Sequence, residues 1–91
     1  MLYLCYSITR QNAKEFRKHF RLSAFSDCYA RYTCNTVSAY GSVDIIRTSK
    51  NSYRVIAFVD YVQFANIAEY KSFHSIEDLC SYLDTLSSQL V

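Results

Sequence analysis

The sequence predicts a single α+β domain over residues 1–91, in which helices pack on a mostly antiparallel sheet of three to four strands. Three observations carry this prediction. The chain has 91 residues, of which 51% are hydrophobic and 20% charged, as in one ordinary globular domain. A β-branched stretch divided by a polar turn indicates a hairpin over residues 43–62. A capped apolar stripe indicates a last helix over residues 75–90, so the expected order is roughly β-α-(α)-β-β-β-α.

The first elements are expected to be a strand and a helix. Residues 2–8 form a short apolar run that suits a central strand. Thr9 is placed to cap a helix over residues 10–21, in which Ala13, Phe16 and Phe20 recur at spacings of three and four residues. Since no Gly or Pro interrupts this pattern, we predict a continuous helix there.

Residues 24–34 fit two patterns. Alternation of Cys28, Ala30, Tyr32 and Cys34 is typical of a strand. A second set of side chains recurs at helical spacing. These side chains are Phe25, Cys28, Tyr29 and Tyr32. We predict a second helix in this segment and keep the strand as the alternative.

The remaining strands follow in the second half of the chain. Residues 43–48 and 53–62 are rich in β-branched and aromatic side chains, and the polar residues 49–52 between them indicate a turn. After a break near residues 63–66, residues 67–73 are expected to form a further strand.

The last helix has the clearest signals. Ser75 is placed to cap it, and Asp78 three residues later supplies the acidic partner of a capping box. An apolar stripe at helical spacing follows the cap, so this helix is expected to pack on the sheet. The stripe comprises Ile76, Leu79, Cys80, Leu83, Leu86 and Leu90.

Charge is unevenly distributed along the chain. Residues 1–54 hold nine of the ten Lys and Arg but three of the eight Asp and Glu, although the net charge is only +2. Five of these cations fall within an arc of about 100° on the wheel of the first helix, an arrangement that suits phosphates or an acidic protein patch. They are Arg10, Lys14, Arg17, Lys18 and Arg21. A solvated helix face is the structural alternative.

Tyrosine is abundant, with nine Tyr and six Phe but no Trp. Sheet packing explains most such residues, but Tyr also concentrates in interfaces and stacks on bases. We therefore add Tyr29, Arg31 and Tyr32 to the candidate residues for binding a partner or nucleic acid.

Few residues of the chain form a pattern suited to catalysis or metal binding. Gly41 is the only glycine, which excludes glycine-rich phosphate loops, and the spacing of His74 and Cys80 does not suit a nucleophile pair. Cys28 and Cys34 lack the partners of a zinc site. We expect no enzyme activity, no cofactor and no metal. We also expect reduced cysteines and a cytoplasmic protein, because the N-terminus has no export signal and no segment is apolar enough to span a membrane.

In size, element order and absence of an active-site motif, the chain resembles the small proteins with which phages and mobile elements inhibit host defence, anti-CRISPR proteins among them. This resemblance implies stoichiometric binding to a large host complex in the host cytoplasm. Many such inhibitors are acidic DNA mimics, and the basic half of this chain departs from that pattern.

We therefore predict a non-enzymatic binding protein that inhibits or regulates a larger host protein or nucleoprotein complex. The alternative is a small nucleic-acid-binding module that uses the basic helix 10–21. A homodimer, in which the acidic half of one copy meets the basic half of another, is electrostatically allowed.

Overall fold

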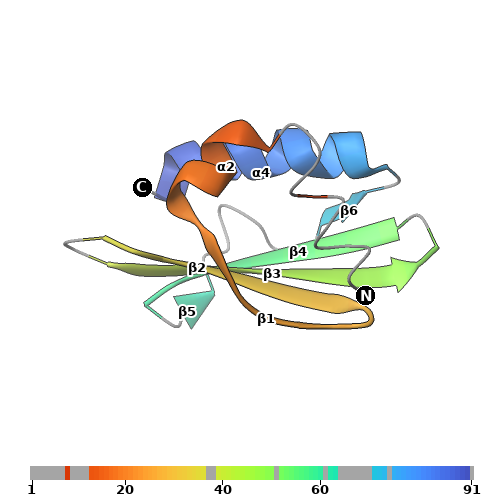
Figure 1. Ribbon diagram of the computed structural model, residues 1–91, viewed down its shortest axis with the longest axis horizontal. Helices are drawn as coiled ribbons and strands as arrows, with labels where there is room; N and C mark the ends of the chain where they lie inside the picture. The colour runs from red at the N-terminus through yellow and green to blue at the C-terminus, as the bar shows by residue number, and fades with distance from the viewer. Residues whose placement is uncertain are drawn as a thin grey trace.

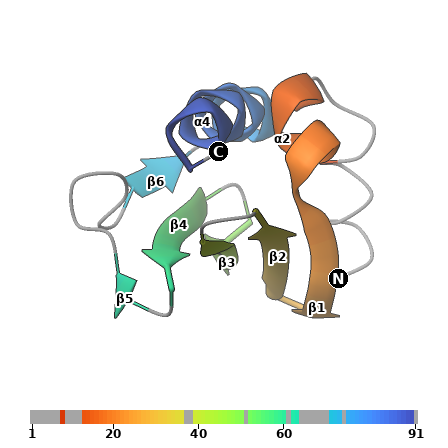
Figure 2. The same ribbon diagram turned by 90° about the vertical axis from the view of Figure 1, so that its left-hand side faces the viewer.

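In the part of the chain that the computed structural model describes, two helices lie on one side of an antiparallel sheet (Figures 1 and 2). The structure describes residues 8, 13–36, 39–50, 52–60, 62–63, 71–73 and 75–90. Its helices are α2 (Lys14–His19) and α4 (Ile76–Leu90). Its strands are β1 (Arg21–Ser26), β2 (Tyr29–Asn35), β3 (Tyr40–Ser49), β4 (Ser52–Val59), β5 (Val62–Gln63) and β6 (Lys71–Phe73).

The sheet is built from successive antiparallel neighbours. Strands β1 to β4 pair in chain order, and the short strands β5 and β6 both pair with β4, near its opposite ends. The hairpin of β3 and β4 forms the centre, where Val43 lies opposite Ala57 and Ile45 opposite Val55. Each of these four side chains is fully buried.

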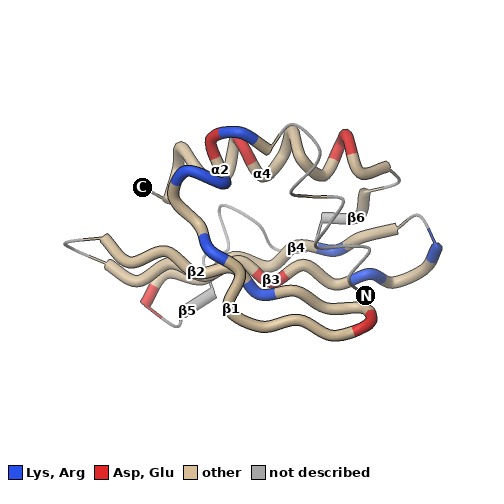
Figure 3. Tube along the Cα trace, in the orientation of Figure 1, with Lys and Arg blue, Asp and Glu red and all other residues tan. Residues whose placement is uncertain are grey.

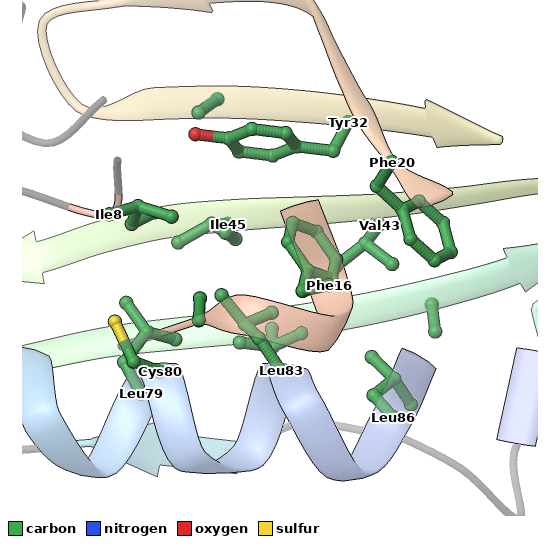
Figure 4. Packing of buried hydrophobic residues seen from close by; sticks show 14 of the residues in the cluster. Ile8, Phe16, Phe20, Tyr32, Val43, Ile45, Leu79, Cys80, Leu83 and Leu86 are labelled. Atoms are coloured by element: carbon green, nitrogen blue, oxygen red, sulfur yellow. The ribbon is translucent and has the colours of Figure 1, made fainter. Parts of the chain in front are cut away.

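The core lies between the helices and one face of the sheet, which we call the closed face (Figure 4). Strand alternation directs every second side chain of β2, β3 and β4 toward the helices. These side chains are Ala30, Tyr32, Cys34, Val43, Ile45, Tyr53, Val55 and Ala57. From α2, the Phe16 ring stacks on Phe20 at 4.7 Å between ring centroids and meets the edge of Tyr32 at 5.1 Å.

Helix α2 is short and takes its N-terminal cap from the other helix. Ala13 at its N-cap position has no side-chain hydrogen bond to the helix. Instead, the Asp84 carboxylate on α4 accepts hydrogen bonds from the backbone N–H of Lys14 at 3.3 Å and of Phe16 at 3.2 Å. A carboxylate at this position also interacts favourably with the positive end of the helix dipole. Asp84 therefore fixes α2 against α4.

Several sequence predictions are confirmed. The chain forms an α+β domain with an antiparallel sheet, the hairpin over residues 43–62 is present as β3 and β4, and the last helix spans Ile76–Leu90. Ser75 caps this helix as predicted, because its Oγ accepts a hydrogen bond from the backbone N–H of Asp78 at 3.2 Å. Leu79, Cys80, Leu83 and Leu86 from the predicted stripe are buried, and Ile76 and Leu90 pack against them.

The second helix predicted over residues 24–34 is wrong, and the expected element order is wrong with it. These residues form the end of β1, a turn at Asp27 and Cys28, and most of β2. The strand alternative was correct for Ala30, Tyr32 and Cys34, which alternate with more exposed residues. Pairing with β3 supplies long-range contacts that the local pattern does not contain.

Element boundaries also differ from the predictions. The helix predicted over residues 10–21 ends at His19, because Phe20 is extended and Arg21 begins β1. Strand β4 ends at Val59, where Asp60 takes a left-handed conformation with φ of 52°. Of the strand predicted over residues 67–73, Lys71–Phe73 is present and the rest lies outside the described residues. Thr9 and the strand predicted over residues 2–8 also lie outside them, except for Ile8, which is helical and buried.

Candidate functional site

The face of the sheet opposite the helices carries the candidate site, and we call it the open face. Neither α2 nor α4 covers it (Figure 2). Alternation and cross-strand register place one set of side chains on this face along β2, β3 and β4. The set comprises Tyr29, Arg31, Thr33, Tyr40, Ser42, Asp44, Ile46, Arg54, Ile56 and Phe58. It mixes aromatic, apolar, polar and charged groups, in contrast to the apolar closed face.

A hydrogen-bonded cluster lies near the middle of the open face. The Arg31 guanidinium donates from Nε to Asp44 Oδ1 at 2.7 Å and from Nη2 to Oδ2 at 3.0 Å, which is a bidentate pair. The Tyr29 hydroxyl donates to Asp44 Oδ1 at 3.2 Å. The Asp44 side chain is 10% exposed and that of Arg31 is 45% exposed. The pair therefore orients Arg31 while leaving much of its guanidinium accessible.

The electrostatics of this cluster follow from its geometry. The hydrogen bond to Asp44 raises the pKa of Arg31 further above its ordinary value, so the guanidinium stays charged. Burial raises the pKa of Tyr29, and the negative charge of Asp44 raises it further. At neutral pH a charged guanidinium and a neutral phenol therefore both donate hydrogen bonds to the Asp44 side chain.

A small hollow adjoins the cluster on the same face. It has a volume of about 140 Å³ and is lined by Arg31, Tyr40, Ser42 and Phe58. Ser42 and Phe58 are directly opposite in the β3–β4 register. Tyr40 is fixed by Asp60, whose Oδ1 accepts a hydrogen bond from the Tyr40 N–H at 2.9 Å and whose N–H donates to the Tyr40 carbonyl at 2.7 Å. The hollow is thus formed by residues on three paired strands.

The binding residues predicted on β2 lie on both faces of the sheet. Tyr29 and Arg31 meet in the open-face cluster, whereas Tyr32 lies on the closed face, 7% exposed against Phe16. Sequence reasoning missed Tyr40, Ser42, Asp44 and Phe58. A signal for Asp44 was present, because it is a lone carboxylate within the β-branched stretch 43–48.

The four described cations of the predicted basic stripe are exposed, and three of them contact α2 or its caps. Figure 3 shows these cations along α2 and at the start of β1. Lys18 Nζ pairs with Glu15 Oε1 at 2.9 Å, and Arg17 Nε donates to the carbonyl of Ala13 at 3.1 Å. Arg21 Nη1 donates to the carbonyls of Arg17 and Phe20 at 2.8 and 3.2 Å. The Arg21 hydrogen bonds satisfy carbonyls at the C-terminal, negative end of the helix, whereas Arg17 and Lys18 reach back to Ala13 and Glu15 near its start. Lys14 is exposed, and Arg10 lies outside the described residues.

The thiols of the closed face are poor nucleophiles. Cys34 and Cys80 are buried and free of disulfides, and Cys28 is free and exposed in the turn between β1 and β2. Burial raises the pKa of Cys34 and raises that of Cys80 to about 11, so both stay protonated at neutral pH. His74 lies outside the described residues, and His19 is exposed on α2.

Within the described residues, no group of three or more His, Cys, Asp or Glu side chains is arranged to hold a metal ion. No helix in the described part of the chain is long and apolar enough to cross a membrane. No protein-family model, curated protein or solved structure matches this chain.

Proposed function

We propose that the protein is a non-enzymatic binding protein that inhibits or regulates a larger protein or nucleoprotein complex by stoichiometric binding through its open face. The observation that carries the proposal is the side of the sheet that neither α2 nor α4 covers, on which Tyr29, Arg31, Tyr40 and Phe58 lie close together. Tyr and Arg are enriched among the residues that dominate the binding energy of protein interfaces.

The order within the open face also supports binding. Asp44 holds Arg31 by two hydrogen bonds, and Asp60 holds the backbone of Tyr40 by two more. Side chains that are already ordered lose less conformational entropy when a partner binds. A paired Arg31 also presents its charge without the full desolvation cost of an isolated cation.

The resemblance to phage-encoded inhibitors of host defence gives the proposal its specific form. Under that reading, the target is a host complex in the cytoplasm, and the protein blocks its nucleic-acid channel or locks its conformation. The resemblance rests on small size and the absence of an active-site motif, since residues 24–34 form strands rather than the helix assumed in the element order.

A nucleic-acid-binding module based on α2 has weaker support. Lys18 is paired with Glu15, and the guanidinium groups of Arg17 and Arg21 bond to carbonyls of α2. Stabilisation of a six-residue helix therefore accounts for much of the basic stripe without phosphate contacts.

A comparison of two double variants tests the proposal. The tagged protein is incubated with lysate of its native host, with and without nuclease, and the captured complex is then tested for activity. We expect Tyr40→Ala with Phe58→Ala to abolish capture, and Lys14→Gln with Lys18→Gln to leave it intact. Circular dichroism and urea unfolding establish that both variants are folded. Capture that is lost with nuclease, or lost only in the lysine variant, contradicts the proposal and favours the nucleic-acid module.

A further inference from the structure

We infer that the hollow lined by Arg31, Tyr40, Ser42 and Phe58 is a receptor for one aromatic ring, the Phe or Tyr side chain of a protein partner. This inference rests on the proposed function and names the chemistry that the open face would recognise. It follows from the size of the hollow, the nature of its lining and the charge around it.

The size of the hollow matches a single six-membered ring. Its volume is about 140 Å³. Benzene occupies an apolar protein cavity of about 150 Å³. The hollow therefore has room for one aromatic ring.

The lining favours an aromatic ring over an aliphatic side chain of similar size. Tyr40 and Phe58 supply aromatic surface, and aromatic pairs gain energy in offset or edge-to-face arrangements beyond the area they bury. The charged guanidinium of Arg31 adds an attraction to a π face. Ser42 and Arg31 also offer polar groups to a phenol hydroxyl.

The charges around the hollow disfavour a nucleobase, which would bring its phosphate with it. Asp44 already balances the charge of Arg31, and the carboxylate of Asp60 lies at the Tyr40 end. The lysines of α2 lie on the other side of the sheet (Figure 3). A neutral aromatic side chain therefore fits this environment better than a nucleotide.

Titration of the full-length, ¹⁵N-labelled protein with matched small probes tests the inference. Phenol and cyclohexanol have similar shape, but only phenol has a π system. We expect saturable shifts at the amides of Arg31, Tyr40, Ser42 and Phe58, with phenol binding about 2- to 10-fold more tightly than cyclohexanol. Equal binding of the two probes, shifts centred on other residues, or tighter binding of thymidine monophosphate would each overturn the inference.

Three variants separate this inference from the proposed function. Ser42→Leu adds a side chain that fills the hollow, and Thr48→Leu makes a matched change on an exposed part of the same strand. We expect phenol binding to be lost in the first variant and kept in the second. Phe58→Ala removes one aromatic wall and should abolish the preference for phenol over cyclohexanol. If Ser42→Leu keeps full capture of the cellular complex, the ring receptor is refuted while binding through the rest of the open face stands.

Discussion

The two faces of one sheet are buried in different ways. On β3, Val43 and Ile45 of the closed face are fully buried beneath helices. Ser42 and Asp44, their neighbours in sequence, are also almost fully buried on the open face, although neither α2 nor α4 covers them (Figure 2). Arg31 holds Asp44 by two hydrogen bonds, and Phe58 lies opposite Ser42. Within the described residues, the closed face thus packs against helices, whereas these open-face side chains contact neighbours in the sheet itself.

This difference separates stability from recognition. The closed face buries apolar groups, each of which contributes free energy in proportion to the area removed from water. The open face relies on an ion pair and hydrogen bonds, whose net contribution to stability is small when one partner remains half exposed. We therefore expect substitutions on the closed face to unfold the protein, and substitutions on the open face to change what it binds.

The largest effect is expected from Phe16→Ala on the closed side. Phe16 is fully buried and contacts both Phe20 and Tyr32, so its removal leaves a cavity between α2 and the sheet. We expect a loss of about 3–5 kcal/mol in the free energy of unfolding, measured by urea denaturation. The exposed substitution Gln89→Ala on α4 serves as the control and should change it by less than about 0.5 kcal/mol. A loss below about 1 kcal/mol for Phe16→Ala would contradict this account of the core.

Alkaline pH provides a second test of the closed face. Burial raises the pKa of Cys80 from 9.0 to about 11, so the folded state keeps a proton that the unfolded state releases. The contribution of this thiol to the free energy of unfolding is fully present below pH 9 and is lost as the pH rises toward 11. At pH 10.5 the loss should be about 2 kcal/mol. Urea denaturation at pH 8 and pH 10.5 measures the change. Between these two pH values, the free energy of unfolding should fall more for the native protein than for Cys80→Ala. Equal losses in the two proteins would show that this thiol does not contribute.

Asp84→Ala tests the attachment of α2 to α4. The substitution removes the acceptor for the backbone N–H groups of Lys14 and Phe16, and we expect it to cost about 1–2 kcal/mol in urea denaturation. Asp84→Asn keeps an acceptor oxygen, so its free energy of unfolding should fall less than that of Asp84→Ala. If the two variants are equally destabilised, the negative charge rather than the hydrogen bonds provides the cap.

This remote cap illustrates which parts of the fold the sequence predicts. Ser75 and the apolar stripe of α4 were predicted because the cap and the residues that it serves are local. The N-terminal cap of α2 was not predicted, because Asp84 lies about 70 residues from Lys14 in the chain. Arg31 and Asp44 are likewise separated by 13 residues, and they meet only through the register of β2 with β3.

The error over residues 24–34 has a related local cause. The side chains that suggested a helix were Phe25, Cys28, Tyr29 and Tyr32. In the structure Phe25 belongs to β1, Cys28 to the turn, and Tyr29 and Tyr32 to opposite faces of β2. A turn between two strands interrupts the period-two alternation, so residues on its two sides fell at helical spacing without sharing a face.

The smallest effect on stability is expected from Asp44→Asn, which removes one charge from the open face with little change of shape. Arg31 is 45% exposed and can turn to water, so the loss should be about 1 kcal/mol in urea denaturation. The informative readout is Tyr29, because burial raises its pKa, the Asp44 carboxylate raises it further and Arg31 lowers it. We expect the pKa of Tyr29, followed by NMR of its ring carbon, to be lower in the variant than in the native protein, since burial remains but the negative charge is gone.

Tyr82 is the internal control for that titration. Burial alone raises its pKa, and it packs against Phe73 on the helix side of the sheet. Its titration should therefore be the same in Asp44→Asn and in the native protein. A shift at Tyr82 would mean that the substitution disturbs both faces, whereas a shift confined to Tyr29 means that the electrostatics of the open face change independently of the core. That independence is what a binding face needs in order to change its partner without loss of the fold.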